Sequence, residues 1–198
     1  MILLVAILAG MAVGLFIARL QKRPWTVPPL RKPWLVIIAF VPQFFNLYLP
    51  ATRTWGSDDL AAAGLIVSML LLLVFCWFNR RLSGVWLLAL GLVTNLVVIA
   101  ANGGFMPISP QTASRLVSPE TLATFGNGDR FGTKDILLLP ENTRLIWLSD
   151  YFLPPKGFPY QVAFSLGDVF IAAGAFWLMG TQGKPLEPTK NIIAKDII

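Results

Sequence analysis

Polar side chains that interrupt long apolar runs are the residues of this chain best placed to do chemistry. Asp168 is the only acidic residue well inside such a run, about eight residues from its nearer end, which on a helix is about 12 Å. An ionisable group within a bilayer is costly, so its presence is by default a sign of function. If the runs cross a membrane, Asp168 is the first candidate for a binding pocket or a proton site.

Other hydrogen-bonding residues fall at about the same depth in the neighbouring runs. They are Gln43, Asn46, Ser68, Thr94, Asn95 and Ser165. One interpretation is a polar binding layer around Asp168. The other is interhelical bonding, in which these groups pair across a bundle and contribute about 0.6 kcal/mol each. The sequence leaves both open.

Several kinds of active site are excluded by composition. The chain has no histidine and a single cysteine, Cys76. Haem held by histidine, cysteine-ligated iron–sulfur clusters, histidine-containing zinc sites and Ser-His-Asp or Cys-His catalytic groups therefore cannot form. We expect no catalytic residues, no metal and no cofactor held covalently or through His or Cys, whereas contact with lipid, quinone or carotenoid stays open.

The elements that must position the polar layer are five apolar runs. Hydrophobic residues make up 56% of the chain and charged residues 13%, against about 25% charged in soluble domains. Each run is long enough for a helix to cross a hydrocarbon core of about 30 Å, and backbone groups in lipid must be satisfied within the helix. The predicted fold is all-α: one membrane domain, 1–198, with five transmembrane helices at 2–20, 34–50, 60–78, 85–101 and 160–179.

Basic residues predict the orientation of these helices. They collect after the first run and between the third and fourth, at Arg19, Lys22, Arg23, Arg31, Lys32, Arg80 and Arg81. The positive-inside rule places these residues in the cytoplasm, with the tail 180–198. The N-terminus and the long loop 102–159 are then outside. The net charge of +6 comes mostly from these cytoplasmic residues, which anchor the helices against anionic headgroups. Nucleic acid is therefore not expected as a partner.

The loop 102–159 has its own punctuation. It opens with Asn102, Gly103, Gly104, Met106 and Pro107, and two Ser-Pro pairs predict short helices at about 110–117 and 119–125. The apolar stretches 136–139 and 145–148 are expected either to close a hairpin or to lie flat at the headgroup level. In both cases the loop covers the polar layer like a lid.

The motif Asn102-Gly103-Gly104-x-Met106-Pro107, together with Gly167-Asp168, resembles a family of small uncharacterised bacterial five-helix membrane proteins. Leu148-Ser149-Asp150, followed by Pro154-Pro155, resembles that family's approach to its last helix. The resemblance implies a multi-pass protein of the bacterial cytoplasmic (inner) membrane. It brings no activity with it, only the indication that the motif residues and Asp168 matter together.

The absence of redox ligands, an aromatic-rich surface and a tail that ends in four isoleucines favour a non-catalytic accessory subunit of a larger membrane complex. Respiratory or photosynthetic electron transport is the setting we expect, with lipid packing or quinone access as the role. The partners would be other membrane subunits and membrane lipid. The alternative is a small transporter or ligand-binding membrane protein that uses the layer around Asp168. A membrane enzyme acting on a lipid or prenyl substrate is a third, less favoured reading, because paired acidic motifs for Mg²⁺-diphosphate chemistry are absent.

Overall fold

A computed structural model describes residues 2–48, 57–155, 157 and 161–181 of the chain. Its long helices are α1 (Ile2–Leu20), α2 (Trp34–Tyr48), α4 (Asp58–Phe78), α5 (Val85–Ala101) and α8 (Leu166–Gly180). α1 and α4 are long and apolar enough to cross a membrane, and the other three apolar helices are shorter. The structure is thus mostly helical, but helix length alone supports two spans rather than five.

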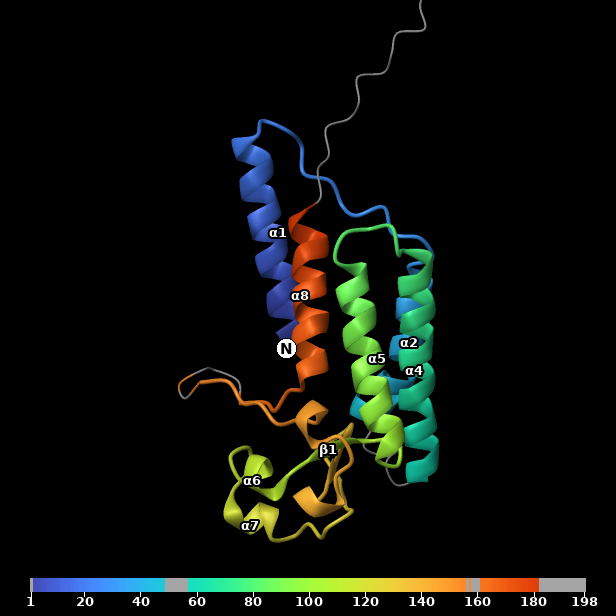
Figure 1. Cartoon of the computed structure of the whole chain (residues 1–198), viewed down its shortest axis with the longest axis vertical. Coiled ribbons are helices and arrows are strands. Elements are labelled where there is room, and N and C mark those ends of the chain that lie inside the picture. Colours follow the sequence, from blue (N-terminus) through green and yellow to red (C-terminus); the bar gives the residue numbers. More distant parts are fainter. Residues whose placement is uncertain (1, 49–56, 156, 158–160, 182–198) are drawn as a thin grey trace, which may run out of the picture.

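The five long helices stand side by side in the order α1, α8, α5, α4, α2 (Figure 1), each packed on the next. The close approach of α8 to its two neighbours depends on glycine. A Cβ at Gly174 would lie 2.6 Å from the backbone nitrogen of Leu88 on α5, and one at Gly14 would lie 2.7 Å from the carbonyl oxygen of Met179 on α8. Backbones that pack without intervening side chains are typical of helix contacts in membranes.

The outward faces of the long helices are apolar. Phe16 of α1 is 65% exposed, Ile37 of α2 is 69% exposed and Trp86 of α5 is 63% exposed. The buried hydrophobic core lies chiefly between α4 and α5, around Met69 and Val98. A soluble protein rarely exposes so continuous an apolar surface.

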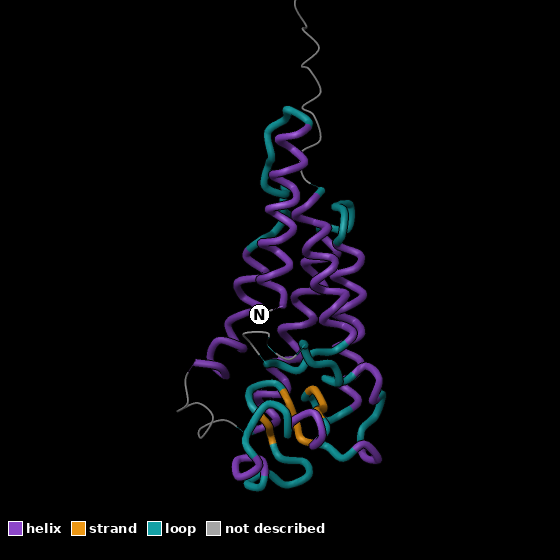
Figure 2. Tube along the Cα trace, turned by 90° about the vertical axis from the view of Figure 1, so that its left-hand side faces the viewer, coloured by secondary structure: helices purple, strands orange, loops and turns teal. Residues whose placement is uncertain are grey.

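One end of the bundle carries a unit made of the described residues 102–155, 157 and 161–165, which we call the sheet segment. It holds a three-stranded sheet in the order β1 (Met106–Ile108), β3 (Asp135–Leu137), β2 (Arg130–Phe131). β1 pairs with β3 in parallel and β2 pairs with β3 antiparallel. Figure 2 shows these strands below the ends of the helices. The fold is therefore not all-α as predicted, because the residues after α5 pair with a later part of the segment.

Two short helices flank this sheet, α6 (Pro110–Ala113) and α7 (Pro119–Leu122). Each begins where the Ser-Pro pairs predict it. The Ser109 side chain accepts a hydrogen bond from the Thr112 amide at 3.1 Å, and Ser118 accepts one from the Thr121 amide at 3.3 Å. Both helices end after four residues, earlier than expected.

Of the two arrangements expected for 136–139 and 145–148, the hairpin does not form, and a position at the headgroup level stays a prediction. Residues 135–137 pair with β1 and β2 instead, and the second stretch becomes a 3-10 turn, η2 (Ile146–Leu148), after a first one, η1 (Pro140–Asn142).

The opposite end of the bundle holds the residues of the predicted cytoplasmic anchor. The linker 21–33 joins α1 to α2 there, and the turn between α4 and α5 lies at the same end (Figure 1). The side chain of Asn79, at the end of α4, fixes the linker: its Oδ1 accepts a hydrogen bond from the Arg31 amide at 2.7 Å and its Nδ2 donates one to the Arg31 carbonyl at 2.9 Å. Six of the seven residues of the predicted cytoplasmic anchor lie in these two segments. The seventh, Arg19, lies in the last turn of α1. The predicted tail lies outside the described residues from 182 onward.

Candidate functional site

The site begins with the first turn of α8. Ser165 caps this helix: its Oγ accepts a hydrogen bond from the Asp168 amide, and the Asp168 Oδ2 accepts one from the Ser165 amide, each at 3.1 Å. Such a reciprocal capping box fixes where a helix starts. Because α8 starts at Leu166 rather than near residue 160, Asp168 lies in the first turn of its helix and not eight residues inside it.

Asn95 of α5 locks onto this capping box from the neighbouring helix. Its Nδ2 donates to the Asp168 Oδ1 at 2.9 Å, and its Oδ1 accepts from the Ser165 Oγ at 2.8 Å. Gly167 makes room for it, since a Cβ there would overlap the Asn95 side chain. Both atoms of the amide are therefore used, and the predicted neighbours Asn95, Ser165 and Asp168 do meet.

The motif after α5 positions the sheet segment over this network. Asn102 ends α5, and its Nδ2 donates to the carbonyls of Val98 at 2.8 Å and Arg144 at 2.9 Å. Its Oδ1 accepts from the Arg144 amide at 2.9 Å. Gly103 and Gly104 follow with φ values of 76° and 90°, a region that favours glycine. The chain thereby turns sharply into β1.

β1 then carries two residues of the predicted motif into the interior. Met106 is 1% exposed, and its amide donates to the carbonyl of Lys134 at 2.8 Å. The Pro107 carbonyl accepts from the Asp150 amide at 3.1 Å. The motif thus organises the backbone around two charged residues, Lys134 and Asp150, that sequence reasoning did not select.

Lys134, Asp135 and Asp150 form a charge cluster in which Asp150 is buried and Lys134 is partly exposed. The Lys134 Nζ donates to the Asp135 Oδ1 at 2.9 Å and to the Asp150 Oδ2. The Asp150 side chain is only 1% exposed, and its Oδ1 has no hydrogen-bond partner among the described residues. One ammonium thus faces two carboxylates, with Asp168 as a third negative group nearby.

This arrangement shifts two pKa values. Burial raises the pKa of Asp150 to about 7 against the attraction of Lys134, and repulsion from Asp135 and Asp168 adds to the rise. For Lys134, burial alone would lower the pKa. The attraction of the three carboxylates more than offsets this and holds the lysine pKa above its ordinary range, so the ammonium stays charged.

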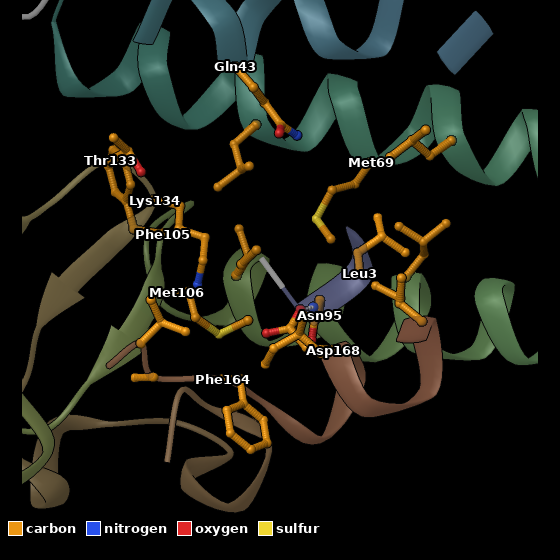
Figure 3. Close-up of a pocket in the computed structure, with 18 of the residues that line it drawn as sticks. Leu3, Gln43, Met69, Asn95, Phe105, Met106, Thr133, Lys134, Phe164 and Asp168 are labelled. Atoms are coloured by element: carbon orange, nitrogen blue, oxygen red, sulfur yellow. Dashed lines mark hydrogen bonds between the residues drawn. The ribbon is translucent and has the colours of Figure 1, made fainter. Parts of the chain in front are cut away.

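A cavity of about 510 Å³ lies between the charge cluster and the capping box of α8. All five long helices and the sheet segment contribute to its wall. Most of the wall is apolar, and its polar members are Gln43, Asn95, Thr133, Lys134 and Asp168. Figure 3 shows Lys134 and Asp168 reaching the cavity from different elements, with Gln43 pointing in from α2.

The residues of the predicted polar layer therefore fall into two groups, those that line the cavity and those that bond to a backbone carbonyl. Gln43, Asn95 and Asp168 line the cavity. Ser68 is buried and donates to the Ala39 carbonyl of α2, which is the interhelical bonding of the second interpretation. Thr94 instead donates to the Leu90 carbonyl of its own helix at 2.8 Å. The side chain of Asn46 lies outside the described residues.

Lys134 and Asp150 are the residues that sequence reasoning missed. Both lie in the loop 102–159, where a charged side chain is ordinarily solvated. The available signal was local: Lys134 and Asp135 precede the apolar stretch 136–139, and Asp150 comes just after the apolar stretch 145–148. Their meeting depends on the pairing of β1 with β3 and on the bond from the Asp150 amide to Pro107.

The arrangement is built for binding. An apolar cavity with a few convergent polar groups is the usual form of a small-molecule site, and this volume is within the common range. The wall offers a charged donor in Lys134, a carboxylate acceptor in Asp168, and the amide of Gln43.

Comparison with known proteins shows a family match over most of the chain. Residues 28–180 match the family described as "Family of unknown function (DUF5317)". The resemblance to an uncharacterised family is confirmed in this form. No curated protein and no solved structure matches the chain.

Proposed function

Because the chain belongs to the DUF5317 family, whose function is unknown, we propose a function from the cavity itself. The protein is a multi-pass membrane protein that binds an amphiphilic small molecule beneath its sheet segment. This is the ligand-binding alternative from the sequence, with the polar layer around Asp168 now extended to Lys134.

The membrane assignment is supported by the surface of the bundle. Exposed apolar side chains cover the outward faces of α2, α5 and α8 as well as those of α1 and α4, the two helices of span length. With the sheet segment and the Lys134 cluster covering one end, we place all five helices in the bacterial cytoplasmic membrane. The linker 21–33 and the turn between α4 and α5 carry the basic residues at the other end, so the N-terminus and the sheet segment face outward and the C-terminus faces the cytoplasm.

The cavity is the single observation that carries the ligand proposal. It lies where the helices meet the sheet segment, at the depth where a bilayer changes from hydrocarbon to headgroups. Its apolar wall, including Leu65, Met69 and Ile171, suits a hydrocarbon body. Lys134 and Asp168 suit a polar end.

A cavity-filling substitution tests this proposal. Leu65→Trp adds volume to the cavity wall, whereas Leu70→Trp makes the same change on the exposed face of the same helix, where Leu70 is 47% exposed. The full chain is purified in nanodiscs made from its native membrane lipids, and bound molecules are identified by native mass spectrometry. We expect the wild type and Leu70→Trp to carry a bound amphiphile and Leu65→Trp to have lost most of it.

Thermal unfolding of both variants shows whether the indole has been accommodated. A folded Leu65→Trp protein that keeps the same bound molecule at the same occupancy would contradict the proposal. So would a wild type that carries nothing beyond what Leu65→Trp carries.

The role of accessory subunit in electron transport stays a prediction. Its supporting features are the absence of redox ligands, an aromatic-rich surface and the four isoleucines of the tail, and the tail from residue 182 onward is outside the described residues. Within the described part of the chain, the cavity supports ligand binding more directly than any feature supports the role of accessory subunit. Native gel electrophoresis of mildly solubilised membranes tests it directly, because an accessory subunit must migrate with a larger complex.

A further inference from the structure

We propose that the ligand of the cavity is an uncharged amphiphile whose head group carries a hydroxyl, which accepts a hydrogen bond from Lys134 and donates one to Asp168. The inference rests on the proposed function and specifies its ligand. It follows from the donors and acceptors that the cavity wall presents, from their charge, and from the apolar remainder of the wall.

Lys134 supplies a donor. An ammonium group has three N–H donors, and two of them are used by Asp135 and Asp150. The side chain is 41% exposed although it lies in a charge cluster, and it forms part of the cavity wall. The remaining N–H is therefore available to an acceptor inside the cavity.

Asp168 supplies an acceptor. Its Oδ1 accepts from Asn95 and its Oδ2 from the Ser165 amide, one bond each. A carboxylate oxygen has room for a second bond, and the Asp168 side chain is part of the cavity wall. The two bonds hold the carboxylate in place, so it is preorganised to receive one further donor.

Lys134 and Asp168 do not satisfy each other. Among the described residues, the ion pairs that Lys134 makes within 4.0 Å join it to Asp135 and to Asp150, and none joins it to Asp168. Both side chains nevertheless reach the same cavity, as Figure 3 shows. A hydroxyl, which is at once a donor and an acceptor, can serve both.

The charge and the hydrogen-bonding groups of the site together disfavour the other common head groups. Three carboxylates surround one ammonium, so an anionic head group such as a carboxylate or phosphate meets net negative charge and cannot donate to Asp168. A primary ammonium is attracted by the carboxylates and can donate to Asp168, but it has no lone pair to accept from Lys134 and leaves that donor without its new partner. A carbonyl, as in a quinone, accepts but cannot donate, which leaves the Asp168 carboxylate without its new partner.

The body of the ligand is hydrocarbon. Beyond the polar wall, the cavity is bounded by Leu72, Leu92 and Ile171 from three different helices, in addition to Leu65 and Met69. These side chains offer no hydrogen bond. The head group alone therefore decides which amphiphile binds.

Four probes with the same lauryl chain test the proposal: lauryl alcohol, laurate, laurylamine and the matching methyl ketone. Binding to the full chain in phosphatidylcholine nanodiscs, a lipid without a free hydroxyl, is measured by native mass spectrometry. Binding to the Leu65→Trp variant is subtracted as the contribution of the surrounding lipid and outer surface. We expect lauryl alcohol to bind at least about tenfold more tightly than each of the other three.

Asp168→Asn provides a gain of binding, which misfolding cannot produce. The Asn oxygen can keep the bond from Asn95, whereas the NH2 group that replaces Oδ2 loses the bond from the Ser165 amide. The NH2 group adds a donor at the cavity wall, and the substitution removes a negative charge. We expect the ketone and laurate to gain about tenfold relative to the alcohol in this variant.

The outcomes separate the two proposals. If no probe binds above the Leu65→Trp background, the proposed function fails and this inference with it. If laurate, laurylamine or the ketone binds the wild type as tightly as the alcohol, the cavity still binds amphiphiles and the hydroxyl inference is wrong. The same holds if the alcohol is preferred but Asp168→Asn leaves the order of the four probes unchanged.

Discussion

Two asparagines make the same set of hydrogen bonds at opposite ends of the bundle. Asn79 ends α4 and Asn102 ends α5. Each donates through Nδ2 to the carbonyl four residues earlier, at 2.8 Å in both cases, and each pairs its amide with both backbone groups of one distant residue, Arg31 or Arg144. A single side chain thus satisfies a helix end and fixes a loop.

The residue scale also shows what sequence can and cannot predict. Asn95, Ser165 and Asp168 were predicted as one polar layer, and they form one hydrogen-bonded network. Their common depth was not sufficient by itself, because it also selected Ser68 and Thr94, which bond to the carbonyls of Ala39 and Leu90 instead. Lys134 and Asp150 could not be predicted in the same way, since a loop has no period that relates position along the chain to position in space.

Asp150 makes stability depend on pH. Its pKa rises from the ordinary 3.8 to about 7 in the folded protein, so between these values the folded state holds a proton that the unfolded state has released. This contribution to stability is complete below about pH 4, decreases as the pH rises toward 7, and is absent above. We expect the unfolding temperature of the wild type to fall across this window.

Asp150→Asn removes the titrating group while it keeps the shape of the side chain, and it should flatten that slope. Exposed Asp59→Asn is the matched control and should leave it unchanged. Unfolding temperatures of the full chain in nanodiscs, measured at several pH values, decide the question. An Asp150→Asn protein with the wild-type slope would show that another group is responsible.

At the scale of elements, the start of α8 is set by side chains rather than by hydropathy. The apolar run predicted a helix from residue 160, whereas the helix begins at Leu166, because Ser165 and Asp168 form a capping box. The Ser-x-x-Asp spacing was present in the sequence as a start signal.

The sheet is a different case: β1 pairs in parallel with a strand almost thirty residues later, and no local pattern specifies such a partner.

The contact between α5 and α8 should be the most sensitive to added volume. Gly167→Ala would place a methyl group into the side chain of Asn95, and it would also meet the Gly91 carbonyl of α5 at 2.8 Å. We expect a loss of about 2–3 kcal/mol in the free energy of unfolding, as for other overpacked contacts. Because Asn95 must move, amphiphile binding should weaken as well.

Gly180→Ala is the control for this substitution on the same helix. Its new Cβ would lie 3.6 Å from the Gly10 carbonyl, an ordinary van der Waals distance. Chemical denaturation of the reconstituted protein compares the two. Equal stability of the two variants would mean that α5 and α8 can separate at no cost, which the close backbone contact does not allow.

At the scale of the whole molecule, the cavity is where every part of the fold meets. α1 and α2 are the two ends of the row of helices, yet Leu3 of α1 and Gln43 of α2 line the same space (Figure 3). The sheet segment covers it with Phe105, Met106 and Lys134. The sequence predicted the helices, their polar layer and a covering loop, but the enclosed volume depends on how all of them pack together.

The proposed orientation gives the last prediction. Glu120 lies on an exposed surface of α7 in the sheet segment, and Arg81 is exposed in the turn at the opposite end of the bundle. The one native cysteine, Cys76, is buried, so Glu120→Cys and Arg81→Cys each introduce a single accessible thiol. A membrane-impermeant maleimide applied to spheroplasts should label Glu120→Cys at once and Arg81→Cys only after the membrane is permeabilised. The wild type, with Cys76 alone, measures the background.

Labelling of Arg81→Cys in intact spheroplasts, with Glu120→Cys protected, would show that the orientation is the reverse of the proposed one. The ligand would then enter from the cytoplasmic half of the membrane, because the cavity lies at the end of the bundle that bears the sheet segment.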